Sequence, residues 1–175
     1  MALHSKKGQR KTRRRLLVVS IGFGAVLVAG LVLLFVGKFP DADDHFARAV
    51  EFLDQGQLDA ALIETKSALN KNPALVKARI LAGDIYLQLD DGISAEKEFS
   101  KAAQQGDASP AIKLRLFRSL LLQDRYDDVA GQMLSLDPQT IGNDFYLIRA
   151  QARLGVGSYD LAREDFNRVL ADTPA

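Results

Sequence analysis

The chain has 175 residues, with 23 Lys and Arg against 22 Asp and Glu, and it contains no cysteine. Without cysteine, disulfide-stapled folds, thiolate zinc sites and cysteine nucleophiles are excluded. The balanced charge is the sum of two unlike parts: residues 1–15 carry seven basic side chains and no acidic one, whereas 15 basic and 22 acidic residues follow from Phe39 onward.

A run of 21 residues without charge, Leu16 to Val36, follows the basic tail. A helix of that length spans roughly 31 Å at about 1.5 Å per residue, enough for a hydrocarbon core of about 30 Å. We therefore expect a transmembrane helix at 16–36. The basic residues before it and the acidic ones after it place the N-terminus in the cytoplasm. In a bacterium, this predicts a single-pass protein of the cytoplasmic (inner) membrane, with the linker 37–42 and the rest of the chain in the periplasm.

Three alternative interpretations of this segment have less support. A cleaved signal peptide typically has a shorter apolar run and a small-x-small cleavage site, but Val36-Gly37-Lys38 follows here. Thr12 to Leu17 is similar to a twin-arginine export signal, yet the strongly apolar run favours membrane insertion. The basic tail lacks the interleaved aromatic residues of a nucleic-acid-binding segment, so we expect no nucleic-acid partner. The small-x-x-x-small spacings Ser20 to Gly24 and Ala25 to Ala29 would let two such helices approach closely, which leaves a homo-oligomer open.

The rest of the chain has helical periodicity interrupted by Gly and Pro turns, and it has no strand pattern. Asp43 or Asp44 can cap the first helix. The fold class that we expect is all-α: a single transmembrane helix followed by about four helical hairpins. The predicted helices after the membrane segment are at 43–55, 58–72, 76–89, 92–105, 110–123, 126–136, 143–155 and 158–171.

Small and aromatic residues between Gly83 and Ala102 follow a pattern that suits two antiparallel helices. Gly83 and Tyr86 fall on the first helix, and Ala95, Phe99 and Ala102 fall on the second. The small residues lack bulk where the helices come closest, and the two aromatic rings fill the space beside them. This pattern resembles the tetratricopeptide repeat (TPR) motif. The resemblance implies an α-solenoid in which each hairpin packs mainly on its neighbours.

The pattern recurs at about the 34-residue period of that family. The repeats are at about 42–75, 76–109, 110–142 and 143–175, within a repeat domain at 43–175. Thr65 in the first unit and Arg153 in the fourth depart from the motif. The third unit is the least regular, because bulky Phe117 occupies a small-residue position and Pro138 comes early. The matching positions are Ala49, Phe52, Gly56, Ala61, Ala68 and Pro73 in the first unit, Tyr126, Val129 and Met133 in the third, and Ala150, Gly157, Tyr159, Ala162, Phe166 and Pro174 in the fourth.

In TPR proteins the first helix of each pair lines a concave face, so the resemblance also implies a mainly apolar groove for protein partners. Each leucine there has a second interpretation, which is packing against a neighbouring helix. The carboxylate-clamp subtype has Lys and Asn where Phe46 and Val50 stand, so its grip on a chaperone's acidic C-terminus is not implied. The groove positions are Phe46, Val50, Leu53, Lys77, Ile80, Asp84, Leu87, Gln88, Leu114, Arg118, Leu121, Leu122, Asp144, Leu147, Gln151 and Leu154.

No group of residues predicts catalysis. His4 lies in the basic tail, and His45 at the start of a helix is interpreted as a packing residue. The pairs Asp90-Asp91 and Asp127-Asp128 lie at turns and lack calcium-loop spacing. Gly155-x-Gly157 is explained by a turn between helices. We therefore predict a protein that is not an enzyme and has no cofactor and no metal site.

The tracts 52–73, 81–102 and 114–129 are similar to the TPR arrays of bacterial exopolysaccharide systems linked to PEP-CTERM sorting. The resemblance implies a membrane-anchored protein–protein interaction scaffold that assists exopolysaccharide synthesis or export. The alternative is a periplasmic chaperone, tethered near the secretion machinery, that binds unfolded clients in the same groove.

The last predicted helix has no polar capping helix after it, although each solenoid unit buries its apolar side only against the next unit. We expect part of the set Leu161, Phe166, Val169 and Leu170 to lie on an uncovered edge. Further repeats, another protein or a second copy would cover that edge.

Overall fold

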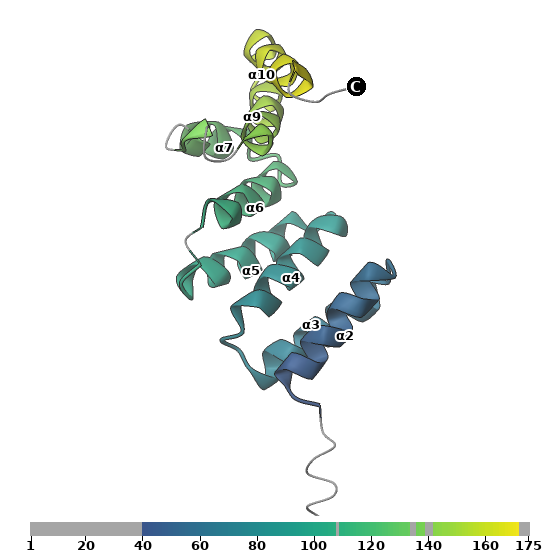
Figure 1. Cartoon of the computed structure of the whole chain (residues 1–175). Helices are drawn as coiled ribbons and strands as arrows, with labels where there is room; N and C mark the ends of the chain where they lie inside the picture. The colour runs from purple at the N-terminus through teal and green to yellow at the C-terminus, as the bar shows by residue number, and fades with distance from the viewer. Residues whose placement is uncertain (1–39, 108, 134–135, 139–141, 172–175) are drawn as a thin grey trace, which may run out of the picture. The chain divides into compact units, whose positions relative to one another are not determined.

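The computed structural model describes residues 40–107, 109–133, 136–138 and 142–171. All regular structure in these residues is helical, and it belongs to one compact unit that begins at Asp41 (Figure 1). The all-α prediction is therefore confirmed for this part of the chain. The helices are α2 (Ala42–Asp54), α3 (Leu58–Lys71), α4 (Val76–Gln88), α5 (Gly92–Gln104), α6 (Pro110–Leu121), α7 (Tyr126–Met133), α9 (Asn143–Gly155) and α10 (Tyr159–Ala171).

The predicted transmembrane helix at 16–36 and the basic tail at 1–15 lie outside the described residues. None of the helices that the structure does describe is both long enough and apolar enough to cross a membrane.

The first helix is capped one turn earlier than the sequence suggested. Asp41, not Asp43 or Asp44, is its N-cap, because the helix begins at Ala42. The backbone N–H of Asp44 donates to Asp41 Oδ1 at 2.9 Å, and the backbone N–H of Asp41 donates to Asp44 Oδ2 at 3.0 Å. This reciprocal pair is a capping box, which satisfies two otherwise free donors.

The close helix contact predicted in the second hairpin is present. Gly83 on α4 packs against the ring of Phe99 on α5, so closely that a Cβ on Gly83 would lie 2.4 Å from Phe99 Cε1. Ala95 and Ala102 are fully buried on the same side of α5. The small residues therefore let the two helices approach, as the motif predicted.

Where the sequence departs from the motif, polar contacts replace the missing aromatic residues. Thr65 is buried and its hydroxyl donates to the carbonyl of Ala61 at 2.7 Å. In the fourth hairpin, Asp165 on α10 is only 3% exposed and accepts from two arginines on α9. Arg149 Nη2 lies 2.6 Å from Asp165 Oδ1, and Arg153 Nη1 lies 2.7 Å from Asp165 Oδ2. The carboxylate raises the pKa of Arg149.

The irregular third hairpin is built around Phe117. Its side chain is buried in the core between α6, α7 and α9. Val129 and Met133 of α7 and Phe145 of α9 belong to the same core. Among the described residues, α7 packs more extensively on α9 than on its own hairpin partner α6. We attribute this to the bulk of Phe117, which stands where the motif has a small residue.

The outer side of α10 is partly apolar. Leu161 and Leu170 are exposed, whereas Phe166 and Val169 are half-buried. Two of the four residues that were considered for an uncovered edge are therefore exposed.

Candidate functional site

A cavity of about 700 Å³ opens between α4, α6, α7 and α9. Six of its lining residues were expected in the groove. Five of them lie on the first helices of three successive hairpins, and the sixth, Leu122, directly follows α6. Tyr126 and Gly155 were not expected there. The lining residues are Leu87, Arg118, Leu121, Leu122, Tyr126, Gln151, Leu154 and Gly155.

One end of the cavity is shaped by a glycine against an aromatic ring. A Cβ on Gly155 would lie 2.2 Å from Tyr126 Cγ, so only glycine lets the last turn of α9 approach the start of α7 this closely. The Tyr126 hydroxyl donates to Asp124 Oδ1 at 2.5 Å, and this bond raises the pKa of Tyr126. In the sequence, Tyr126 is a motif position and Gly155 belongs to a turn, and no local signal shows that they meet.

The polar groups of the cavity are few. Arg118 is the one charged residue among the lining residues that the structure describes. Its Nη2 lies 3.1 Å from Asp144 Oδ1, and both side chains are about half exposed. Exposed pairs of this kind contribute about 0–1 kcal/mol, so a carboxylate on a partner can replace Asp144 at little cost. Gln151 adds an exposed amide that can both donate and accept.

Apart from Leu87, the predicted groove residues of the first two hairpins lie outside this cavity. Lys77 lies over the ring of Phe46, 4.6 Å from its centroid, and also pairs with Asp43 at 2.6 Å. Asp84 pairs with Arg115 at 2.7 Å.

The other predicted apolar groove positions differ in how deeply they are buried. Ile80 packs on the core of the second hairpin, and Val50 and Leu53 are half-buried. Leu114 is a buried core residue and is not among the lining residues of the cavity. The described cavity is therefore confined to the last three hairpins.

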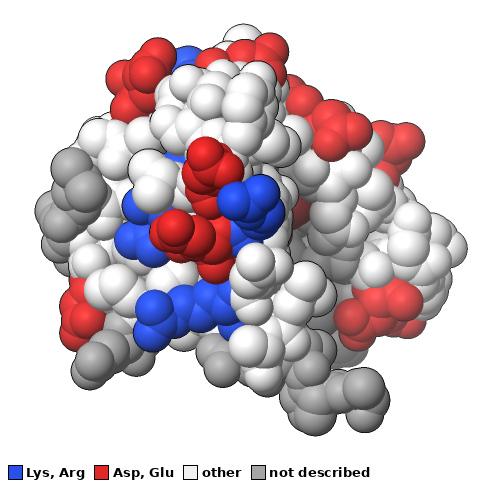
Figure 2. Space-filling view, turned by 90° about the horizontal axis from the view of Figure 1, so that it is seen from above, with Lys and Arg blue, Asp and Glu red and all other residues white. Residues whose placement is uncertain are grey.

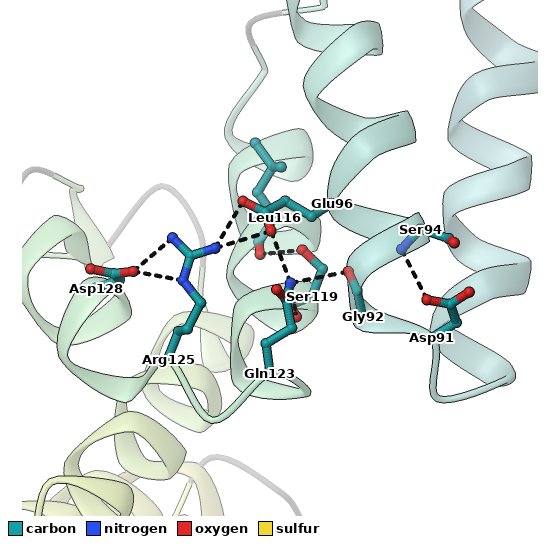
Figure 3. A network of polar contacts seen from close by, with 9 residues as sticks. All are labelled: Asp91, Gly92, Ser94, Glu96, Leu116, Ser119, Gln123, Arg125 and Asp128. Atoms are coloured by element: carbon teal, nitrogen blue, oxygen red, sulfur yellow. Dashed lines mark hydrogen bonds and ion pairs between the residues drawn. The ribbon is translucent and has the colours of Figure 1, made fainter.

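A polar network that the sequence did not reveal joins the second hairpin to the third. Arg125 Nη1 donates to both oxygens of Glu96, each at 3.1 Å, and Arg125 Nε donates to Asp128 Oδ2 at 2.8 Å (Figure 3). Gln123 Nε2 donates to the Gly92 carbonyl at 3.2 Å. Arg125 lies 29 residues from Glu96 and Gln123 lies 31 residues from Gly92, so no spacing within a helix reveals these two contacts. The network fixes the start of α5 against the turn between α6 and α7.

The described residues give no indication of a metal centre, because none of their His, Asp and Glu side chains gather in a group that could hold an ion. On the face in Figure 2, basic and acidic side chains lie next to one another and form no broad basic field. Nucleic-acid binding depends on such a field. The cavity remains the best candidate site.

No protein-family model matches the chain, and no curated protein matches it. Several solved structures resemble it. A tetratricopeptide repeat protein from Parabacteroides merdae has a TM-score of 0.67 and 21% identity, over 80% of this chain and 55% of that protein. MamA MSR-1 has a TM-score of 0.64 and 18% identity, over 75% and 76% of the two chains. MamA AMB-1 has a TM-score of 0.62 and 19% identity, over 85% and 84%.

The chain spans about half the length of the Parabacteroides protein. At these identities the likeness shows the fold alone, and it confirms a TPR-type solenoid of helical hairpins. The expected link to PEP-CTERM exopolysaccharide systems stays a prediction.

Proposed function

We propose that the hairpin array is a protein-binding scaffold and that its partner enters the cavity between α4, α6, α7 and α9. The observation that carries the proposal is the composition of the cavity. Its walls are leucines, and Arg118 and Gln151 supply the polar groups. Mostly apolar hollows with a few convergent polar groups are typical of binding sites. Such a site recognises a segment by an apolar side chain with a polar group beside it.

The test changes the two exposed leucines of the cavity wall. Leu122→Glu with Leu154→Glu should reduce recovery of a cross-linked partner at least tenfold, because carboxylates in the cavity oppose burial of an apolar side chain. Both leucines are exposed, so helicity should not change. The measurement is photo-cross-linking of the full-length chain in membranes, followed by quantitative recovery.

The matched control is Ile63→Glu on α3, an equally drastic change at a side chain that is 64% exposed and lies outside the cavity. It should leave recovery unchanged. Equal recovery with the Leu122 and Leu154 double variant would move the binding site elsewhere.

We propose in addition that residues 16–36 anchor the scaffold in the inner membrane with the hairpins in the periplasm. The support is the uncharged run of 21 residues with basic residues before it. A reporter fused after Ala175 should be active only outside the cytoplasm, and the chain should stay in membranes after alkaline washing. A shorter, soluble species would contradict the anchor.

The proposed pathway is assembly of an exopolysaccharide synthesis or export machine, and its support is the resemblance of the tracts 52–73, 81–102 and 114–129. The open apolar cavity also suits the alternative, a chaperone for unfolded periplasmic clients. Neighbouring glycosyltransferase and polysaccharide-export genes would favour the first, and secretion or outer-membrane assembly genes the second. A chaperone should also slow aggregation of a denatured client, and Leu122→Glu with Leu154→Glu should abolish that effect.

A further inference from the structure

Exposed apolar side chains continue from the cavity onto the turn between α9 and α10. Leu154 belongs to the cavity wall and is 50% exposed, and Val156 and Tyr159 follow it at 37% and 68%. Isolated exposed apolar residues need no explanation, but a group of them beside a hollow marks an interaction site. The turn begins directly after Gly155 of the cavity wall, so Val156 adjoins the cavity in the chain.

The turn supplies a protrusion with an acidic residue beside it, and the cavity is a hollow with a basic one. Tyr159 is the protrusion, since it is the first residue of α10 and most of its ring is exposed. Asp160 follows it; its side chain is 86% exposed and pairs with exposed Arg163 at 2.9 Å, a contact that another arginine can replace at little cost. The hollow is the cavity, whose charged lining residue is Arg118. The bond from Arg118 to Asp144 is a single contact at the rim, which an incoming carboxylate can replace.

We infer that a second copy of this chain occupies the cavity, with its Tyr159 between the leucine walls and its Asp160 paired with Arg118. The inference rests on the proposed function, because it names the partner of the same site. A phenol ring suits the hollow: its face packs on leucine, and its hydroxyl can reach the Gln151 amide. The cavity, at about 700 Å³, is large enough for a ring and its neighbours.

Each copy supplies both a tyrosine and a cavity, so the inferred contact is a two-fold one in which each tyrosine enters the other copy's cavity. An isologous contact of this kind closes at two copies, whereas a head-to-tail contact would continue into a filament. The expected product is a dimer.

The first test is the oligomeric state of the full-length chain, kept in mild detergent and followed by sedimentation equilibrium. Tyr159→Ala should raise the dimer dissociation constant about thirtyfold, as truncation of a central aromatic anchor does. Leu170→Ala is the control, because Leu170 is 70% exposed and lies at the far end of the same helix. A wild-type chain that stays monomeric, or that grows beyond a dimer, would overturn the inference.

The second test exchanges the charges. Arg118→Asp and Asp160→Arg should each raise the dissociation constant about tenfold, and the two changes in one chain should restore it, since each copy supplies both partners. Failure to restore the dimer would overturn the Arg118 to Asp160 pairing.

The third test uses the absence of cysteine from the chain, because any disulfide must then join introduced thiols. A chain with Tyr159→Cys mixed with a chain with Leu122→Cys should form a disulfide-linked pair under mild oxidation. Ile63→Cys mixed with Leu122→Cys should not. Equal linkage in both mixtures would show random collision and would contradict the docked geometry.

These outcomes are distinguishable from failure of the proposed function. If the chain is monomeric while Leu122→Glu with Leu154→Glu still abolishes recovery of another protein, only the second-copy inference is wrong. If neither self-association nor partner recovery depends on the cavity, both are wrong.

Discussion

Two helical glycines have opposite surroundings, and substitution by alanine should have opposite effects. In α4, a Cβ on Gly83 would overlap the ring of Phe99, whereas in α7 a Cβ on Gly131 would meet open space. Gly83→Ala should therefore destabilise the fold by about 1–3 kcal/mol through overpacking. Gly131→Ala should stabilise it by up to about 1 kcal/mol, because alanine is the better helix former. Urea unfolding of both variants measures the difference, and destabilisation by both would show that the Gly83 contact is not specific.

The second residue-scale prediction concerns Asp165, which holds two arginines of α9 from the facing helix. Asp165→Ala should lower the free energy of unfolding by about 3 kcal/mol, because it leaves Arg149 and Arg153 without their shared carboxylate. Glu164→Ala on the same helix is the control for stability, since the side chain of Glu164 is exposed. A loss no larger than that of the control would mean that the arginines find equivalent partners in water.

At the scale of an element, the N-cap of α5 should make stability depend on pH. Asp91 accepts from the backbone N–H of Ser94 at 2.9 Å, and hydrogen bonds from Ser94 hold the pKa of this carboxyl below its usual 3.8. The lowered pKa means that the cap stabilises the fold above the unfolded pKa and that this stabilisation is lost as the pH falls through the folded one.

Asp91→Ala should therefore cost about 1 kcal/mol at neutral pH, as loss of a cap does. Asp91→Asn should keep most of the stability at neutral pH and remove this part of the acid dependence. Unfolding curves at pH 7 and pH 3 measure both effects. Equal acid sensitivity of wild type and Asp91→Asn would assign that sensitivity to other carboxylates.

The helices were predictable because their ends depend on nearby residues. Ser109 and Pro110 start α6 at the predicted residue, and α9 has the predicted bounds. The end of α7 was not, because Leu136, where the predicted helix ends, lies outside the helix.

The groove was harder to predict than the helices. The motif gives the direction of each Cβ, but the side chains of neighbouring helices decide what stays uncovered. Lys77 lies over Phe46 and Asp84 pairs with Arg115, and none of these three predicted groove residues lines the cavity. In the sequence, Arg153 is a departure from the motif, and only the fold shows that it forms an ion pair with Asp165. Long-range partners of this kind have no local signal.

On the scale of the whole array, each helix contacts the helices next to it along the stack. In the part of the chain that the structure describes, α5 packs extensively against two helices, α4 and α6, whereas α10 packs extensively against one, α9. A solenoid's stability is close to a sum of unit and nearest-neighbour terms, so units with fewer neighbours open first.

Amide hydrogen exchange should therefore be faster in α10 than in α5. The measurement is native-state exchange by mass spectrometry on the full-length chain with Tyr159→Ala, so that self-association does not protect α10. Fusion of a polar capping helix after Ala175 should slow exchange in α10 and leave α5 unchanged, because the cap adds a neighbour only to the last hairpin. Equal protection of α10 and α5 without the cap would show that the pairing of α10 with α9, clamped by Asp165, is sufficient on its own.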